Sequence, residues 1–327
     1  MSSPGDTNIP EEAKSSAETN TNKSRLLLFL LLLVATTVPL FLPFPVPNKP
    51  VPASMDLFAS LMGVPNGSTV IVQSDWTTST RGESGGEMEA ILRILMRKDC
   101  KLAIYSAADP QAPEVAKNTL ISLNDERKAK GQRIYERWND YVIVGYFPNA
   151  EGANNAMAAD LRKAWSAKKD VSPEGTYQSV FNSPVLKDIH ALNDVPLALI
   201  VTASNSFNIF IERIYGKVPI AAAVTGVMGP ESQVYYASGQ IKGLSSGLKG
   251  VYDLETMMEY GINTPGPDGK IAVEWRDHPA VKGFPGEVNF AKGKLYYPTL
   301  HVALTLLILA VVTGNVLMFK ARRRAKA

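Results

Sequence analysis

The chain has 327 residues, a net charge of +3 and one cysteine, Cys100. One cysteine excludes an internal disulfide, and a near-neutral central segment leaves no electrostatic footprint for nucleic acid. Two long apolar runs near the ends of the chain indicate a membrane protein. Cys100 lies between an expected helix and an expected strand, so we predict a small buried residue rather than a reactive thiol.

The N-terminal region divides into a polar tail and an apolar run. Residues 1–24 are rich in Ser, Thr, Asn and Glu, which predicts a disordered tail. Residues 25–45 contain the run LLLFLLLLVATTVPLFLP, close to the roughly 20 apolar residues that a membrane span needs. The alternative is a cleaved signal peptide. Because prolines follow the run and no small-x-small cleavage site does, we predict an uncleaved signal anchor.

A second apolar run, at residues 298–319, is long enough to span a bilayer and is followed by the basic tail 320–327. Basic residues flank both runs, which predicts two passes through a cytoplasmic or inner membrane with both termini cytoplasmic. The main domain would then be periplasmic or extracellular. It would begin after residues 46–67, a proline-rich stalk and entry segment that we expect to be extended.

Residues 68–260 alternate between apolar β-branched runs and amphipathic runs. The expected strands are 68–75, 102–107, 141–147, 197–203 and 219–225, and the expected helices are 87–98, 114–130, 155–168 and 207–215. Strands that are apolar throughout predict a mostly parallel sheet with helices on both faces, the Rossmann-like α/β class. Between these elements we also expect a short helix at 184–191. Residues 261–297 are an irregular return segment in this interpretation, with a strand pair around 271–275.

The stretch Tyr235–Tyr260 contains four glycines spaced four, four and three residues apart. They are Gly239, Gly243, Gly247 and Gly250. That spacing places all four on one face of a helix, where another backbone could approach closely. We predict a long final helix that packs through these glycines on the sheet or on a second copy of the chain. A loop rich in Gly and Ser is the alternative.

Ligands of an open parallel sheet bind beyond the carboxyl ends of its strands, and polar residues gather there in this sequence. The pocket candidates are Ser74, Trp76, Arg81, Ser106, Tyr146, Thr202, Ser204 and Thr225. The candidates for catalysis are Asp75, Glu83, Asp109 and Asn205. The second group would surround the pocket, and its carboxylates could do acid–base work.

Each suggestive motif has a structural alternative. Ser84 and Glu87 have the spacing of a helix capping box, and their glycine-rich loop could otherwise bind an anion. Asp75 and Asp109 could share a divalent cation, although Asp109 precedes a proline and fits a turn. No histidine has metal-ligand spacing and no phosphate-binding fingerprint occurs, so we predict no metal site and leave the cofactor open.

No characterised family is evident from these residues, and three functions fit the pattern. The first is an accessory, scaffold or assembly subunit that contacts other membrane proteins and the lipid bilayer. The second is a membrane-tethered enzyme that acts on a nucleotide-linked or cell-envelope substrate. The third is an extracytoplasmic ligand sensor. A homo-oligomer through the glycine face fits the first function, and nucleic acid fits none of them.

Overall fold

A computed structural model describes residues 11–41, 46–276, 278–285 and 292–324, with the side chains of 11–24 and 324 excepted. The chain forms two compact units. The α/β domain is Pro47–Lys294, and the helical unit combines Met1–Val46 with Leu295–Ala327.

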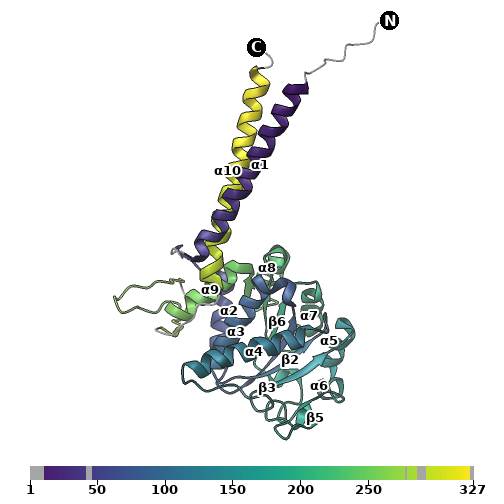
Figure 1. Cartoon of the computed structure of the whole chain (residues 1–327). Helices are drawn as coiled ribbons and strands as arrows, with labels where there is room; N and C mark the ends of the chain where they lie inside the picture. Colours follow the sequence, from purple (N-terminus) through teal and green to yellow (C-terminus); the bar gives the residue numbers. More distant parts are fainter. Residues whose placement is uncertain (1–10, 42–45, 277, 286–291, 325–327) are drawn as a thin grey trace. The chain divides into compact units, whose positions relative to one another are not determined.

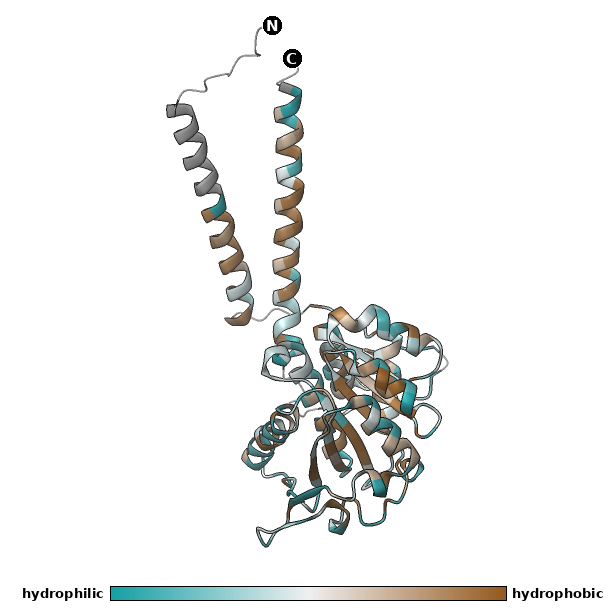
Figure 2. Cartoon of the chain, turned by 90° about the vertical axis from the view of Figure 1, so that its right-hand side faces the viewer, coloured by the Kyte–Doolittle hydropathy of each residue, from teal (hydrophilic) through white to brown (hydrophobic). Residues whose placement is uncertain are grey.

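The helical unit contains α1 (Glu11–Phe41) and most of α10 (Gly293–Arg324). Among the described residues, only α10 is both long and apolar enough to cross a membrane. Figure 2 shows hydrophobic residues along most of its length. The apolar part of α1 is shorter, Arg25–Phe41, and residues 42–45 of the predicted first span lie outside the described residues. The helix also includes residues 11–24, for which the composition predicted disorder.

The α/β domain is built on a six-stranded parallel sheet. Its strands are β1 (Thr69–Asp75), β2 (Lys101–Ser106), β3 (Tyr141–Tyr146), β6 (Ala198–Thr202), β7 (Ile220–Val224) and β8 (Leu244–Ser246). They lie in the order β3-β2-β1-β6-β7-β8. This is a Rossmann-like order, with the chain winding outward from β1 in both directions. The predicted α/β class is therefore confirmed, and five of the six strands match predicted runs.

Two separate hydrophobic layers bury the two faces of the sheet. In β1, Val70 and Val72 point to one layer and Ile71 points to the other. The Val70 face is covered by α2 (Pro52–Gly63), α3 (Gly86–Arg97), α4 (Ala112–Ala129) and α9 (Gly247–Tyr260). The Ile71 face is covered by α5 (Ala150–Ala159), α6 (Leu161–Ala164) and α7 (Ser206–Ile214). Figure 1 shows these helices around the sheet.

The predicted short helix at 184–191 is wrong. That region contains turns, between the 3-10 turns Val180–Asn182 and Leu192–Asp194. It follows a small antiparallel pair, β4 (Lys169–Val171) and β5 (Tyr177–Ser179). The return segment is irregular as expected. It contains only isolated bridges among its described residues, including one between Pro265 and Ile271, rather than a strand pair at 271–275.

The entry segment is structured, and its second half is not a free stalk. Pro50 is buried, and α2 begins at Pro52. The sequence carries the signals for this helix, a proline at its first position and buried residues Leu57, Phe58 and Leu61 at helical spacing. The element was missed because the neighbouring prolines dominate the composition.

The predicted long helix through the four glycines is wrong. The stretch is divided among α8 (Gly229–Ala237), β8 and α9. Gly239 and Gly247 have φ angles of +74° and +58°, so the chain turns at both residues. At the other two glycines, Gly243 and Gly250, another part of the chain does approach closely. A Cβ at Gly243 would lie 2.2 Å from the backbone N of Leu57, and one at Gly250 would lie 2.2 Å from Ser245 Oγ.

Replacing Gly243 with alanine is expected to destabilise the domain by about 2 kcal/mol, because the new methyl group has to displace the α2 backbone. Gly63→Ala is the matched control. It lies in the same α2–β8 region, a Cβ added there would have nothing within 4 Å, and the variant is expected to be neutral or slightly stabilising. Thermal unfolding of the purified chain in mild detergent measures both. Equal midpoints for the two variants would contradict the packing of Gly243 on Leu57.

Candidate functional site

The strand order defines where a ligand would bind in this fold. Successive crossovers from β1 lead to β2 and β3 on one side, and the chain then returns to β6 on the other side of β1. The switch point therefore lies between β1 and β6, where ligands of open α/β sheets usually bind. Asp75 and Thr202 are register partners at the carboxyl ends of these strands. The sequence thus predicted the correct edge of the sheet for its polar residues.

The carboxylate of Asp75 is buried and fully occupied by donors from the chain itself. Its Oδ1 accepts hydrogen bonds from Ser106 Oγ at 2.7 Å and from the backbone N–H groups of Ala107 and Ala108 at 2.8 and 3.2 Å. Its Oδ2 accepts one from Gln73 Nε2 at 2.5 Å. Asp75 and Ser106 therefore fix the loop after β2, and neither side chain is presented to a substrate.

A buried polar chain continues beneath this loop. Gln73 Oε1 accepts a hydrogen bond from the Tyr105 hydroxyl at 2.7 Å, and Asn154 lies 2.9 Å from the same hydroxyl. Burial raises the pKa of Tyr105 well above its usual value, and the charge of Asp75 adds to the effect. Tyr105 therefore stays protonated and donates. The network anchors β1, β2 and α5 to one another rather than supplying a general base.

Three hydroxyl groups meet at the end of β6. Thr202 Oγ1 lies 3.2 Å from Ser204 Oγ and 3.0 Å from Ser206 Oγ, and the two serine hydroxyls are 3.1 Å apart. The backbone N–H groups of Ser204 and Ser206 also donate into this cluster, at 3.1 and 3.4 Å. Asn205 is exposed and its side chain makes no capping bond to α7. The cluster shapes the start of α7, and no described histidine stands beside it to activate a hydroxyl.

The β1–α3 connection does not form the predicted capping box. Ser84 is buried with no hydrogen-bond partner for its Oγ, and Glu87 points away into the domain. Glu87 Oε1 accepts a hydrogen bond from Ser245 Oγ at 2.9 Å. Glu83 accepts one from the backbone N–H of Gly226 at 2.6 Å. The connection is thus joined to the carboxyl ends of β7 and β8 by two glutamates, which also make it unsuited to hold an anion.

Burial raises the pKa of Glu87 well above its usual value, and the nearby Glu83 raises it further. Hydrogen bonds from Ser245 and from the Gly247 backbone oppose this shift without cancelling it. The folded protein therefore binds the Glu87 proton more tightly than the unfolded chain does. Stability consequently falls as the pH rises from the unfolded pKa near 4.5 through the folded pKa.

Glu87→Gln is expected to remove this fall of stability with rising pH, because the amide side chain fills the same space and cannot ionise. The variant should be more stable than the wild type at neutral pH, and the two should converge as the pH falls toward the unfolded pKa of a glutamate. Unfolding midpoints measured across that pH range test the prediction. Glu212→Gln is the control, because Glu212 is exposed, and its unfolding midpoint should follow that of the wild type at every pH. A Glu87→Gln variant with the same pH dependence as the wild type would contradict the prediction.

The remaining candidates do not converge on one pocket. Ser74 and Trp76 are buried on the α3 side of β1, and Ser74 Oγ and Trp76 Nε1 have no hydrogen-bond partner. Asp109 accepts a hydrogen bond from the backbone N–H of Gln111 at 2.7 Å, as expected of a turn residue. Tyr146 and Thr225 are half-buried at the ends of different strands. Among the described residues, no group of three His, Cys, Asp or Glu side chains could hold a metal ion.

Two of the cavities in the described part of the α/β domain lie away from the switch point. A cleft of about 260 Å³ follows β3 and is lined by Phe147, Pro148, Asn149, Gly152, Ala153, Ala156 and Ala164. A larger one of about 540 Å³ lies between the entry and return segments, lined by 48–50, Met55, 271–274 and Arg276. None of the predicted site residues lines either cavity. The larger one leaves no signal in the sequence, because its walls come from two irregular segments that are far apart in the chain.

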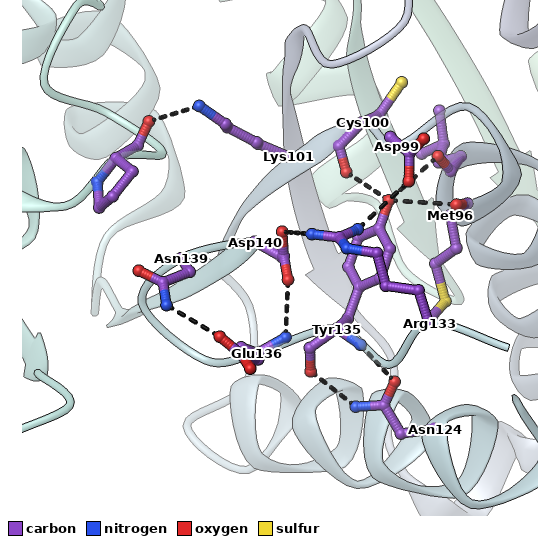
Figure 3. Close-up of polar contacts among 12 residues, drawn as sticks. Met96, Asp99, Cys100, Lys101, Asn124, Arg133, Tyr135, Glu136, Asn139 and Asp140 are labelled. Atoms are coloured by element: carbon purple, nitrogen blue, oxygen red, sulfur yellow. Dashed lines mark hydrogen bonds and ion pairs between the residues drawn. The ribbon is translucent and has the colours of Figure 1, made fainter. Parts of the chain in front are cut away.

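A second polar cluster lies at the opposite, amino edge of the sheet and has a structural role (Figure 3). Arg133 forms ion pairs with Asp140 and, at 3.2 Å, with Asp99. The buried Tyr135 donates a hydrogen bond from its hydroxyl to the Cys100 carbonyl at 2.9 Å. Cys100 is buried as predicted, and burial raises the pKa of its thiol to about 11. The cluster therefore closes the turn before β2, and Cys100 is unreactive at neutral pH.

Helix α9 holds both ends of the α/β domain, a role that the sequence did not reveal. Asp253 accepts a hydrogen bond from the Val51 N–H at 3.1 Å and pairs with Lys249, which also donates to Asn48 Oδ1 at 2.9 Å. At the other end, the Glu255 carboxylate accepts hydrogen bonds from three successive N–H groups at 2.9, 2.9 and 2.7 Å. These donors belong to 292–294, where α10 begins, so Glu255 caps that helix.

The chain matches no family model, and no curated protein or solved structure matches it. The geometry alone therefore defines its class. It is a Rossmann-like α/β domain that leads directly into a helix able to span a membrane.

Proposed function

We propose that the protein is a membrane-anchored accessory or assembly subunit whose α/β domain acts through contacts with other membrane proteins. The observation that carries this proposal is that polar side chains of the chain itself fill the switch point between β1 and β6. Asp75, Ser106 and Thr202 are buried and hydrogen-bonded within the chain, so the position where this fold usually binds a ligand is filled by structural contacts. A domain whose switch point is filled by its own side chains fits a binding role better than a catalytic one.

In this proposal the chain crosses the membrane twice. Helix α10 supplies one span, and the apolar segment that includes Arg25–Phe41 supplies the other. Basic residues flank both segments, which supports cytoplasmic termini and a main domain on the outer side of a cytoplasmic or inner membrane. The entry segment and the start of α10 are both hydrogen-bonded to α9, so one helix holds both ends of the domain's chain.

Gentle-detergent purification of the tagged chain from native membranes tests the proposal, with untagged membranes as the control. Mass spectrometry should find one or a few membrane proteins in fixed proportion to the chain. Recovery of the chain with no enriched membrane protein would contradict the accessory role. It would favour instead the tethered enzyme or the ligand sensor, with the cleft after β3 as the first place to search for a ligand.

A further inference from the structure

Helix α8 and the 3-10 turn that leads into it expose an apolar stripe. Val227 and Val234 are 89% and 67% exposed, and Pro230 and Ala237 are exposed as well. These four residues recur at intervals of three, four and three, which is the spacing of one face of a helix. Ser232, which is buried, lies on the opposite face. The two valines are therefore neighbours on one surface, two helical turns apart, rather than isolated apolar residues.

The stripe cannot turn inward, because the other side of α8 is anchored within the α/β domain. The Tyr235 ring packs edge-on against Phe207 of α7, with 5.4 Å between the ring centroids. The Tyr236 hydroxyl donates a hydrogen bond to Asp56 Oδ2 of α2. Rotating the helix to bury the valines would break both contacts. The stripe is thus a fixed apolar surface of the folded domain, and a partner can bind it without a change of conformation.

The charges beside the stripe are acidic. The turn and α8 contain no Lys or Arg and a single carboxylate, the exposed Glu231. Burial raises the pKa of Tyr235, and the charges of Glu212 and Glu231 raise it further, so both carboxylates lie near α8. Arg213 follows Glu212 in the chain, but it pairs with Glu151 of α5. Of the carboxylates in the described part of the chain, these two have no ion-pair partner and can receive a cation from outside.

A second copy of the chain is a poor match for this surface. Glu231 lies between Pro230 and Val234, near the middle of the stripe, and Asn208 Nδ2 donates to its Oε1 at 2.5 Å. If two copies paired through the stripe around a two-fold axis, both Glu231 carboxylates would lie near that axis and repel each other. A helix with apolar residues at the same spacing and Lys or Arg beside them would instead find opposite charges there.

We propose that the stripe on α8 is the surface that binds the partner protein, and that the partner supplies an amphipathic helix whose apolar side is flanked by Lys or Arg. This inference rests on the proposed accessory function, because it names the surface through which that contact is made. Val227 and Val234 supply the apolar part of the contact. Glu231 and Glu212 select the sign of the partner's charge.

Photocrosslinking in native membranes tests the inference, with p-benzoylphenylalanine in place of Val234 in the tagged full chain. Irradiation should join position 234 to a peptide of another protein, with Lys or Arg within one helical turn of the crosslinked residue. The same replacement at Ile121, which is 45% exposed on α4, is the control and should give no such product. A crosslink to this chain itself, equal crosslinking from both positions, or none from position 234 would overturn the proposal.

Recovery of the partner in mild detergent separates this inference from the proposed function. Val234→Asp should lower that recovery by about tenfold, because a carboxylate in the apolar contact would lose its water, and Ile121→Asp should leave recovery unchanged. Unchanged recovery with Val234→Asp would overturn this inference and leave the accessory function standing. If the wild-type chain recovers no membrane protein, both fail. Since Val234 is exposed, an unchanged thermal midpoint shows that the variant is folded.

Glu231→Lys tests the charge of the partner. The substitution should lower recovery by about fivefold at low salt and by less at high salt, because salt screens the repulsion between the new lysine and a basic partner. Recovery that rises in Glu231→Lys would overturn the basic character of the partner helix.

Discussion

Replacing Asp75 with alanine is expected to destabilise the α/β domain by about 4 kcal/mol. The substitution removes the acceptor of four hydrogen bonds, from Gln73 Nε2, Ser106 Oγ and the backbone N–H groups of Ala107 and Ala108. Three of these donors belong to the buried residues Gln73, Ser106 and Ala107, and most would be left without a partner in a site that is poorly open to water. The measurement is denaturant unfolding of the purified chain in mild detergent, followed by tryptophan fluorescence.

Asp109→Ala is the matched control for this prediction. Asp109 is also a carboxylate just beyond a strand, but it makes one exposed hydrogen bond within a turn, so its loss should cost about 0.5 kcal/mol. A stable Asp75→Ala variant that loses a biochemical activity would contradict our account and assign Asp75 to catalysis. A large loss of stability, with the control unaffected, would support the structural role.

Glu255→Ala is expected to destabilise the domain by about 3 kcal/mol. Its carboxylate accepts three backbone hydrogen bonds at the start of α10, and Gly293 packs so closely on α9 that a Cβ there would lie 2.5 Å from the Tyr252 N. Hydrogen exchange at 292–294 should rise in the variant, because these amides lose their acceptor. The unfolding midpoint and the exchange rates together measure the effect.

Two further substitutions distinguish the loss of the helix cap from the general effect on stability of removing a negative charge. Glu255→Gln keeps one acceptor oxygen, so its loss of stability should fall between those of the wild type and the alanine variant. Glu212→Ala removes an exposed carboxylate from α7 and should stay within about 0.5 kcal/mol of the wild type. If Glu255→Ala were as stable as Glu212→Ala, the cap at the start of α10 would be refuted.

The sheet was largely predictable because its central strands have an unambiguous pattern. β6 and β7 are short runs of apolar or small residues, β1 begins with the run TVIV, and all three strands are buried on both faces. Their order could not be predicted, since it depends on which strands pair across the sheet. β8 was missed because Leu244–Ser246 is only three residues long and carries two serines.

The glycine stretch shows how a correct physical argument gave a wrong element. Glycine spacing indicated close approach, and Gly243 and Gly250 do meet neighbouring groups closely. The turns at Gly239 and Gly247 were marked by the dipeptides Ser238-Gly239 and Ser246-Gly247, which are common turn signals. Given equal weight, those signals would have divided the stretch correctly. The helical pattern that follows Gly247 was real, and it became α9.

The sequence placed the polar candidate residues at the carboxyl edge of the sheet, where the structure also places them, but it gave no sign of their hydrogen bonds within the chain. Residue type and strand position identified Asp75, Ser106 and Thr202. The sequence could not show that the main partners of Asp75 include backbone amides of the next loop, which exist only in the folded chain. The roles of Asp253 and Glu255 could not be predicted for the same reason, because their hydrogen-bond partners are far away along the chain.

The measurement that tests the central claim most directly is the native mass of the chain released from its own membranes in mild detergent. Our account predicts a species heavier than one copy of the chain, with the excess explained by a different membrane protein in whole-number proportion. A mass equal to one copy, or to a multiple of this chain alone, would contradict the accessory role. It would direct attention to ligands of the cleft after β3.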